Sequence, residues 1–571
     1  MAHDLTEQTA TVTATPATVK ASPNGLRRVS SSLKETLRVI FKHATKHTGV
    51  GIICAVAYFD PGNWGVDLQA GSQFGYKLLF IVLLSGLVAI YMQVLSSRLG
   101  CVTGLDLASH CRLLLHDRPK HTLLWRWLVL YPLYALAEVA IVATDLAELL
   151  GSAIALCLLF PSLPLWAGVL LTASDVLLLL AMRDPLGGKP ARLFEVVIAA
   201  LVFTVLICMA VIISKAGVHW GVAFDGFVPS RSVVSSEGLY TSIGILGATV
   251  MPHSLFLGSA FATQERESPA SKDLNDSLSK VETKELDTDD AESVPEQPRR
   301  SWWQPREWPG RAAKFFRDCF RVTPVEKSAH EPKNHSEIEN HSFAFVKTHL
   351  WHGIVDMCIS LLGIAVVINS LILMLASAEF YYGFGETGNE SPATLFDAYD
   401  LLRELLGKPA ATLFALALLA SGQSSSIIAT LAGQTVSEGF IRWRVSPVLR
   451  RLITRVLGLI PSTIVAAALG RGGVSALLVI SQVVLSIVLP FIVFPLIYIT
   501  SSKRFMGVKR PRSQVSQAES SDANVTVDVE VAGETVDFSN GRIMTVLGWI
   551  QWIVIVLANA YAIVTLAMGE D

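Results

Sequence analysis

Charged residues are scarce in this sequence. Only 16% of the 571 residues are Asp, Glu, Lys or Arg, whereas soluble domains carry about 25%. The two signs nearly balance, with 46 Lys plus Arg against 48 Asp plus Glu, which argues against a nucleic-acid-binding protein because such proteins show a basic excess. With 51% hydrophobic residues, the composition predicts one large all-α integral membrane bundle with polar insertions.

Cysteines are also few. There are seven, an odd number, and none lies in a CxxC or Cys/His zinc motif. Most lie in or beside apolar runs, where a thiol behaves as a small hydrophobic group. We therefore expect neither a disulfide framework nor a zinc site, and we expect no bound cofactor.

Several apolar segments are long enough to cross a bilayer, whose hydrocarbon core of about 30 Å needs about 20 helical residues. Lys and Arg gather in the short loops after the second, fourth, eighth and tenth segments, which predicts a cytosolic N-terminus and a C-terminus on the opposite side. The eleven candidates lie near 48–66, 76–98, 123–150, 165–182, 194–214, 236–262, 350–378, 409–431, 450–469, 475–500 and 543–567.

The polar segments between these spans define the expected organisation. Spans one to five and six to ten would form two repeats, and an odd number of spans in each repeat forces inverted topology, with the eleventh span peripheral. The predicted regions are a disordered cytosolic tail at 1–47, spans one to six at 48–262, a charged cytosolic insertion at 263–345, spans seven to ten at 346–500, a polar cytosolic loop at 501–541, and the last span with a short C-terminus at 542–571. We expect the insertion to be mostly disordered over 264–342 and the polar loop to be disordered over 503–541.

Two spans contain an X-Pro step with a polar or sulfur-bearing residue in their middle. The first reads GIICAVAYFDPGNWGVDLQ and includes Asp60, Pro61 and Gly62, and the sixth reads GILGATVMPHSLFLGSA and includes Met251 and Pro252. Proline removes one N–H and clashes with the carbonyl four residues back, so both helices should break. Interrupted helices at matching positions of two halves indicate a transporter with inverted repeats.

The two breaks together offer a candidate metal site. The ligands would be the Asp60 carboxylate, the Asn63 amide oxygen, the Met251 thioether, and the freed carbonyls of Ala57 and Ala248. Oxygen ligands alone would suit Ca²⁺ or Mg²⁺, whereas a soft sulfur adds affinity for Mn²⁺, Fe²⁺ and later transition metals. The alternative is a packing methionine beside structural proline kinks, but a carboxylate at the centre of a membrane helix costs about 2.5–3.5 kcal/mol, which favours the metal site.

The third span carries three carboxylates. Glu138, Asp145 and Glu148 fall within about 80° of arc on one helix face, where they are costly unless hydrated or paired. Arg451 and Arg455, which enter the ninth span, are the expected partners. This stripe is either a proton route or a static ion-pair network.

At these residues the chain resembles the Nramp family of divalent metal-ion transporters, in particular its fungal Smf-type members. Four motifs carry the resemblance: Asp60–Asn63 in the first span, Met251–His253 in the sixth, SGQSSSIIATLAGQTVSEGF at Ser421–Phe440, and SQVVLSIVLPF at Ser481–Phe491. The match spans roughly residues 48–500, apart from 264–342. It implies a LeuT-like fold, a 5+5 inverted repeat plus one peripheral helix with helices 1 and 6 broken, and metal–proton symport towards the cytosol.

The resemblance also implies roles for single residues. Asp60, Asn63 and Met251 would be side-chain ligands, Ala57 and Ala248 would supply carbonyls in some states, and Gln482 would join the site when it is occluded. The third-span stripe would be a proton route, and His253 would contribute to pH dependence. The alternative role for His253 is structural, a hydrogen bond to the broken backbone. Relatives that move magnesium or aluminium usually lack the methionine, so Met251 supports the manganese and iron branch.

These observations favour a proton-coupled Mn²⁺/Fe²⁺ importer that works by alternating access and is not an enzyme, with Cd²⁺, Co²⁺ and Zn²⁺ as further candidate substrates. Its expected partners are metal ions, protons, the lipid bilayer, and regulatory or ubiquitin machinery acting on the cytosolic tails. We expect it in the plasma membrane or in an endosomal or vacuolar membrane. The alternatives are an amino-acid symporter of the same architecture, against which Asp60 counts because it would repel a carboxylate, and a metal sensor that does not transport.

Overall fold

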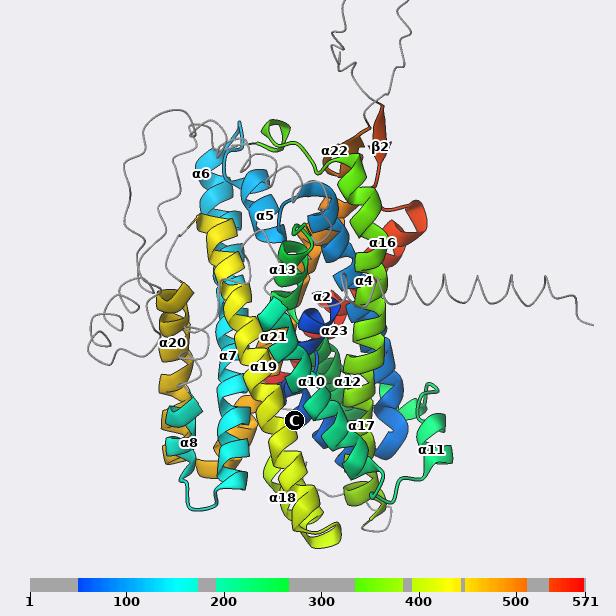
Figure 1. Ribbon diagram of the computed structural model, residues 1–571, viewed down its shortest axis with the longest axis vertical. Helices are drawn as coiled ribbons and strands as arrows, with labels where there is room; N and C mark the ends of the chain where they lie inside the picture. Colours follow the sequence, from blue (N-terminus) through cyan, green and yellow to red (C-terminus); the bar gives the residue numbers. More distant parts are fainter. Residues whose placement is uncertain are drawn as a thin grey trace, which may run out of the picture. The chain divides into compact units, whose positions relative to one another are not determined.

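The computed structural model describes residues 50–172, 192–265, 334–383, 393–442, 447–510 and 534–568 (Figure 1). These residues belong to one unit of the chain, 48–571. The predicted tail at 1–47, most of the insertion at 263–345 and the middle of the polar loop at 501–541 lie outside the described residues.

Helices account for almost all of the described chain, as predicted. The first half contains α2 (Val50–Val56), α3 (Pro61–Phe74), α4 (Leu79–Thr103), α5 (Leu107–Leu115), α7 (Tyr131–Leu159), α8 (Leu165–Thr172), α10 (Arg192–Ile213), α12 (Ser236–Thr249) and α13 (Pro252–Phe261). The second half contains α16 (Phe343–Ser360), α17 (Val367–Ala376), η8 (Ser377–Tyr382), α18 (Leu395–Leu405), α19 (Lys408–Ile441), α20 (Pro447–Ala468), α21 (Gly470–Thr500), α22 (Lys503–Met506) and α23 (Arg542–Met568).

Eight helical segments of the described chain are long and apolar enough to cross a membrane. One of them, Pro61–Thr103, joins the second half of the predicted first span to the second span. The predicted ninth span corresponds to a shorter apolar helix, Leu452–Ala468, and the predicted fourth span is described only as far as Thr172. The membrane bundle is confirmed, and the remaining spans differ from the prediction in how the helices join or end.

Both predicted helix breaks are present, between α2 and α3 and between α12 and α13. Helix α7 runs beside α19 and also contacts α3, α20 and α21 (Figure 1). Glycines allow close approaches between helices: a Cβ added at Gly151 of α7 would lie 2.0 Å from Cβ of Pro61, and one at Gly100 of α4 would lie 1.9 Å from the carbonyl oxygen of Ser259. Small residues at such crossings let membrane helices pack backbone to backbone, which seats the first break directly against α7.

Two short strands are the exception to the helical architecture. Strands β1 (Gly507–Lys509) and β2 (Thr535–Asp537) pair antiparallel, with Val508 opposite Val536. They close the two ends of the polar loop that we expected to be disordered, so that expectation is wrong at 507–509 and 535–537.

The end of the charged insertion is also ordered. Asn340 Nδ2 donates to the carbonyls of Phe505 (2.9 Å) and Gly507 (2.7 Å), and the amide of His341 donates to the carbonyl of Val102 (3.1 Å). Residues 334–342 are therefore fixed to the end of α4 and to the segment that follows α21, so the expectation of disorder is wrong for this part of the insertion.

A pair of histidines joins the same insertion segment to α5. His335 Nε2 lies 2.9 Å from His110 Nδ1, and His110 Nε2 lies 2.8 Å from the hydroxyl of Thr103, which itself donates to the Leu99 carbonyl (2.7 Å). Burial lowers the pKa of His335 to about 4, with the Arg504 guanidinium acting in the same direction. Burial and the neighbouring His335 lower the pKa of His110 to about 3, so both rings are neutral at pH 7.

Acidification should therefore destabilise this part of the molecule. Below about pH 6.5 the unfolded chain binds protons at both histidines that the folded chain excludes, so stability falls as the pH drops towards about 4. We expect the thermal unfolding midpoint of the detergent-solubilised protein to fall between about pH 7.5 and pH 5.5. The fall should be smaller in His335→Gln, and an equal fall in both proteins would contradict this assignment.

Candidate metal site

The first break is built around Asp60. Its backbone is extended (φ −63°, ψ 167°), and its carboxylate accepts hydrogen bonds from the amides of Gly62 (3.2 Å) and Asn63 (3.1 Å). Pro61, the first residue of α3, has no N–H to leave unsatisfied. Asp60 is thus the N-cap of α3, a position at which Asp is among the preferred residues. The Asp-Pro step that ends the regular helix also starts the next one.

The second break repeats this arrangement with a different side chain. Met251 is extended (φ −84°, ψ 123°) and precedes Pro252, the first residue of α13. Its side chain does not cap the helix, and it is fully buried. The thioether therefore lies inside the bundle at the break.

One side chain bridges the two breaks. Asn63 Nδ2 donates to Asp60 Oδ1 (2.6 Å) and to the carbonyl of Ala248 (2.9 Å), and Asp60 and Asn63 are at most 1% exposed. The Ala248 carbonyl, predicted to lose its helical partner, is thus turned towards the first break. The positive end of an amide lies between a carboxylate and a carbonyl, so these two oxygens form a place suited to a cation. For Asn63 to add its own oxygen as a ligand, its amide must turn and withdraw the NH₂ group.

Gln482 of α21 lies against the same break, as the family resemblance implies. A Cβ added at Gly62 would lie 1.7 Å from Gln482 Nε2, so glycine is required there for this approach. Gln482 is fully buried and donates weakly to the Ser481 hydroxyl (3.3 Å). Its Oε1 accepts no hydrogen bond within the described residues, which leaves an amide oxygen available at the site.

A crevice reaches this glutamine from the side of α23. Its volume is about 510 Å³ including the open mouth, and it lies between α3, α12, α21 and α23. Its polar lining comes from Gln69, Thr241, Gln482, Ser486 and Asn559. The site is thus approached by a partly polar space on one side.

The carbonyls released by the first break are taken up by side chains that sequence reasoning missed. Asn369 Nδ2 donates to the carbonyl of Tyr58 (2.7 Å), and the carbonyl of Phe59 accepts from the Ser421 hydroxyl (2.6 Å) and the Trp64 indole (3.1 Å). Ala57 lies in the tightened turn just before them, where its amide donates a hydrogen bond to the carbonyl of Cys54 (3.2 Å). A lone asparagine within the apolar run of α17 was the available signal, because a buried amide needs partners.

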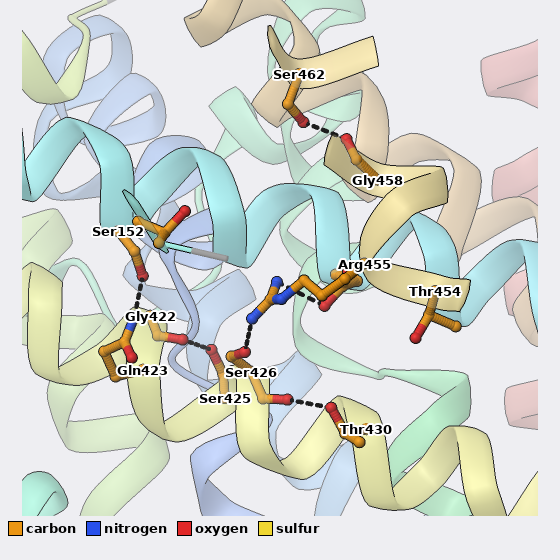
Figure 2. A network of polar contacts seen from close by, with 12 residues as sticks. Ser152, Gly422, Gln423, Ser425, Ser426, Thr430, Thr454, Arg455, Gly458 and Ser462 are labelled. Atoms are coloured by element: carbon orange, nitrogen blue, oxygen red, sulfur yellow. Dashed lines mark hydrogen bonds and ion pairs between the residues drawn. The ribbon is translucent and has the colours of Figure 1, made fainter. Parts of the chain in front are cut away.

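His253 connects the second break to α7. It is the second residue of α13, it is 1% exposed, and its Nδ1 lies 3.2 Å from the Thr144 hydroxyl. The next residue of α7, Asp145, forms a buried ion pair with Arg455 of α20 (2.8 Å). Figure 2 shows the Arg455 guanidinium directed also to Ser426 of α19, to which it donates. A polar chain therefore runs from the break to an arginine on a neighbouring helix.

The outer members of the third-span stripe differ in their pairing. Glu138 pairs with Arg450, a residue that the sequence analysis did not select, and the side chain of the predicted partner Arg451 lies outside the described residues. Glu148 is 1% exposed and forms no ion pair with a described residue. One predicted pair, Asp145 with Arg455, is present in the structure.

The two breaks supply one carboxylate, amides, carbonyls and a thioether. Within the described ranges no group of three or more His, Cys, Asp or Glu residues could hold a metal ion, so the site differs from the charged clusters that hold permanent metals. A single buried charge with neutral ligands can strip part of a cation's hydration shell and still release the ion.

The sequence and the fold of this chain match those of known proteins. Residues 51–287 and 330–518 match the family model described as natural resistance-associated macrophage protein-like. The chain is 41% identical over 526 residues to the manganese transporter pdt1 of Schizosaccharomyces pombe, covering 92% of this chain and 86% of the relative. It is 35% identical over 548 residues to the iron transporter SMF3 of Saccharomyces cerevisiae, covering 94% and 99%. Among solved structures, the Eremococcus coleocola manganese transporter aligns with a TM-score of 0.63 and 28% identity over 90% of this chain and 85% of that one.

Proposed function

The chain belongs to the natural resistance-associated macrophage protein-like (Nramp) family, and from this premise we propose that it is a proton-coupled transporter of divalent transition-metal ions, Mn²⁺ and Fe²⁺, which it moves towards the cytosol. The observation that carries the proposal is the joining of two helix breaks at one place, with the Asp60 carboxylate and the Ala248 carbonyl on either side of the Asn63 amide. Relatives named as manganese and iron transporters support both substrates.

The ligand chemistry supports a transition metal over calcium or magnesium. Asp60, Ala248, Asn63 and Gln482 offer oxygens, and the buried Met251 offers a sulfur that hard cations bind poorly. Oxygen plus thioether ligation suits Mn²⁺ and Fe²⁺ equally. Cd²⁺, Co²⁺ and Zn²⁺ are further substrates on the same argument. The protein requires no resident cofactor and acts as a transporter rather than as an enzyme.

Alternating access follows from where the ligands lie. Each broken span has two helical halves that meet at the site, α2 with α3 and α12 with α13, so either pair of halves can move while the ligands stay at the hinge. A bound cation would link the two breaks directly. We propose that the N-terminus is cytosolic, so that α2 and α13 border the cytosolic side, and that the protein resides in the plasma membrane or an endosomal or vacuolar membrane, with regulatory machinery acting on its cytosolic segments.

The proton route supported best starts at the metal site itself. A cation arriving at Asp60 competes with a proton there, and His253, Thr144 and Asp145 lead from the second break to Arg455. Glu148 lies one helical turn from Gly151, which touches Pro61, and Glu138 with Arg450 continues the stripe along α7. An amino-acid symporter is disfavoured because Asp60 would repel the substrate's carboxylate.

Asp60→Ala should abolish metal transport, because it removes the only carboxylate that the described residues place at the breaks. We expect Mn²⁺ uptake into proteoliposomes to fall at least about tenfold, since a lost charged ligand costs several times RT. Asp225→Ala, which changes an acidic residue at the end of the short helix α11 (Trp220–Asp225) away from the breaks, is the control and should leave uptake unchanged. Near-normal flux in Asp60→Ala would reject the site, and Mn²⁺ binding without any flux in the unmodified protein would indicate a metal sensor.

Met251→Ala should change selectivity more than it changes Mn²⁺ transport. Without the soft ligand, Ca²⁺ and Mg²⁺ should compete for Mn²⁺ uptake at concentrations about tenfold lower than for the unmodified protein. The measurement is ion-competition uptake with Mn²⁺, Fe²⁺, Cd²⁺, Ca²⁺ and Mg²⁺ across a pH series. Unchanged competition would remove the role assigned to the thioether.

Asp145→Asn should weaken proton movement more than metal binding. The change keeps the side-chain shape but removes the ion pair of Asp145 with Arg455, so we expect metal-driven acidification of the vesicle lumen to fall about tenfold or more while Mn²⁺ affinity changes by less than about threefold. The double variant Asp145→Asn with Arg455→Gln removes both charges, so it shows whether a loss of acidification comes from a lost proton route or from the buried arginine charge left behind by Asp145→Asn. Intact acidification alongside Mn²⁺ entry would show that the ion pair is purely structural.

A further inference from the structure

Helix α3 carries a second carboxylate on the same face as the metal ligands. Asp67 follows Asp60 by seven residues and Asn63 by four. Within α3, Asn63 and Asp67 are about 40° of arc apart at 100° per residue, and Asp60 caps the helix and is hydrogen-bonded to Asn63. We call Asp60, Asn63 and Asp67 the ligand face of α3. The face that meets the second break at Asn63 therefore continues along the helix to another carboxyl group that could bind a cation.

Asp67 has none of the structural uses that would explain a buried carboxylate. It is 2% exposed and lies in the middle of α3, so it caps no helix end. Its Oδ2 accepts no hydrogen bond within the described chain, and it forms no ion pair there. Helix α3 contains no Lys or Arg. A bare carboxylate inside a membrane protein is expensive and marks a functional position by default.

The position of Asp67 along the helix indicates its use. It lies about 10 Å from Asp60, at a rise of 1.5 Å per residue, on the side of α3 that ends at Phe74. With the N-terminus cytosolic, that end of α3 borders the outer side. A cation that follows the ligand face inward meets Asp67 before Asp60.

We propose that Asp67 is an outer cation-binding residue that captures the partly hydrated divalent metal ion on its way to Asp60. This inference rests on the proposed transport function and on its orientation. Two carboxylates on one helix face without a described cationic partner favour a divalent ion over a monovalent one, because a divalent ion carries enough positive charge to neutralise both. Such a residue raises the local concentration of the ion and the rate of capture without taking part in the final ligand set.

The test is Mn²⁺ uptake by the reconstituted full-length chain carrying Asp67→Asn. We expect the KM for Mn²⁺ to rise about five- to tenfold while kcat stays within about twofold, because capture is impaired and the inner site is intact. Asp67→Glu, which keeps the charge, should stay within about twofold of the unmodified KM. Asp67→Ser is a second neutral variant for use if Asp67→Asn does not reconstitute.

The matched control is Glu379→Gln. Glu379 lies in η8, is 7% exposed, and belongs to the same end of the bundle, where Tyr382 stacks on Tyr76. The variant Glu379→Gln removes one buried carboxylate from this end of the bundle but none from the ligand face, so the KM for Mn²⁺ should not change. An equal rise in Glu379→Gln would show a general field effect and overturn the proposal.

Three other results would overturn the role of Asp67. They are an unchanged KM in Asp67→Asn, a lower kcat at unchanged KM, and an equal rise in Asp67→Asn and Asp67→Glu, which would indicate packing rather than charge. Parallel measurements on the unmodified protein and on Asp60→Ala keep the two proposals apart. If the unmodified protein moves no metal, the transport function fails, whereas normal transport with an unaffected Asp67→Asn rejects only the outer residue.

Discussion

The hydrogen bonds of the Asn63 amide hold the two broken helices together. Proline at the start of α3 and α13 removes helical hydrogen bonds at membrane depth, where no lipid group can replace them. Asn63 satisfies one such carbonyl, that of Ala248, while it also binds the carboxylate of Asp60. A cation could take over this function, because it would bind the same two oxygens more strongly than an amide does. Under the proposed function, the stability of the break and the binding of metal would therefore depend on the same atoms.

The packing around the first break follows from the same requirement. The carbonyls of Tyr58 and Phe59 need donors, and Asn369 and Ser421 supply them from α17 and α19. Those donors can reach the backbone only if the helices approach closely. Gly151 lets a third helix, α7, approach the same break, since any side chain there would collide with Pro61. The break thus constrains which residues its neighbours can carry, even though those neighbours are far away in the sequence.

This dependence explains how much could be predicted from the sequence. The breaks and the residues beside them were predictable because the effect of proline on a helix is local, and the third-span stripe was predictable because it lies on one helix face. The choice of Arg450 for Glu138 was not, since neighbouring arginines on α20 differ by 100° in direction and only the rotation of α20 against α7 decides between them. Asn369 was missed because the carbonyl that it bonds, that of Tyr58, lies 311 residues away in the chain. The order of residues 334–342 was also missed, because it depends on contacts with Val102 and Phe505, far along the chain.

The pairing of carboxylates differs between α7 and α3. On α7, Asp145 and Glu138 each face an arginine, so these pairs carry little net charge to attract a divalent metal. On the ligand face of α3, Asp60 and Asp67 face no described cation, so under the proposed function their oxygens would be available to the metal. Glu148 forms no ion pair with a described residue and lies one turn from Gly151, the glycine that touches Pro61. Under the proposed function, a proton released when metal binds Asp60 would find Glu148 as a carboxylate of α7 close to the first break, so the metal site would connect to the third-span stripe without bringing the metal into contact with the arginines.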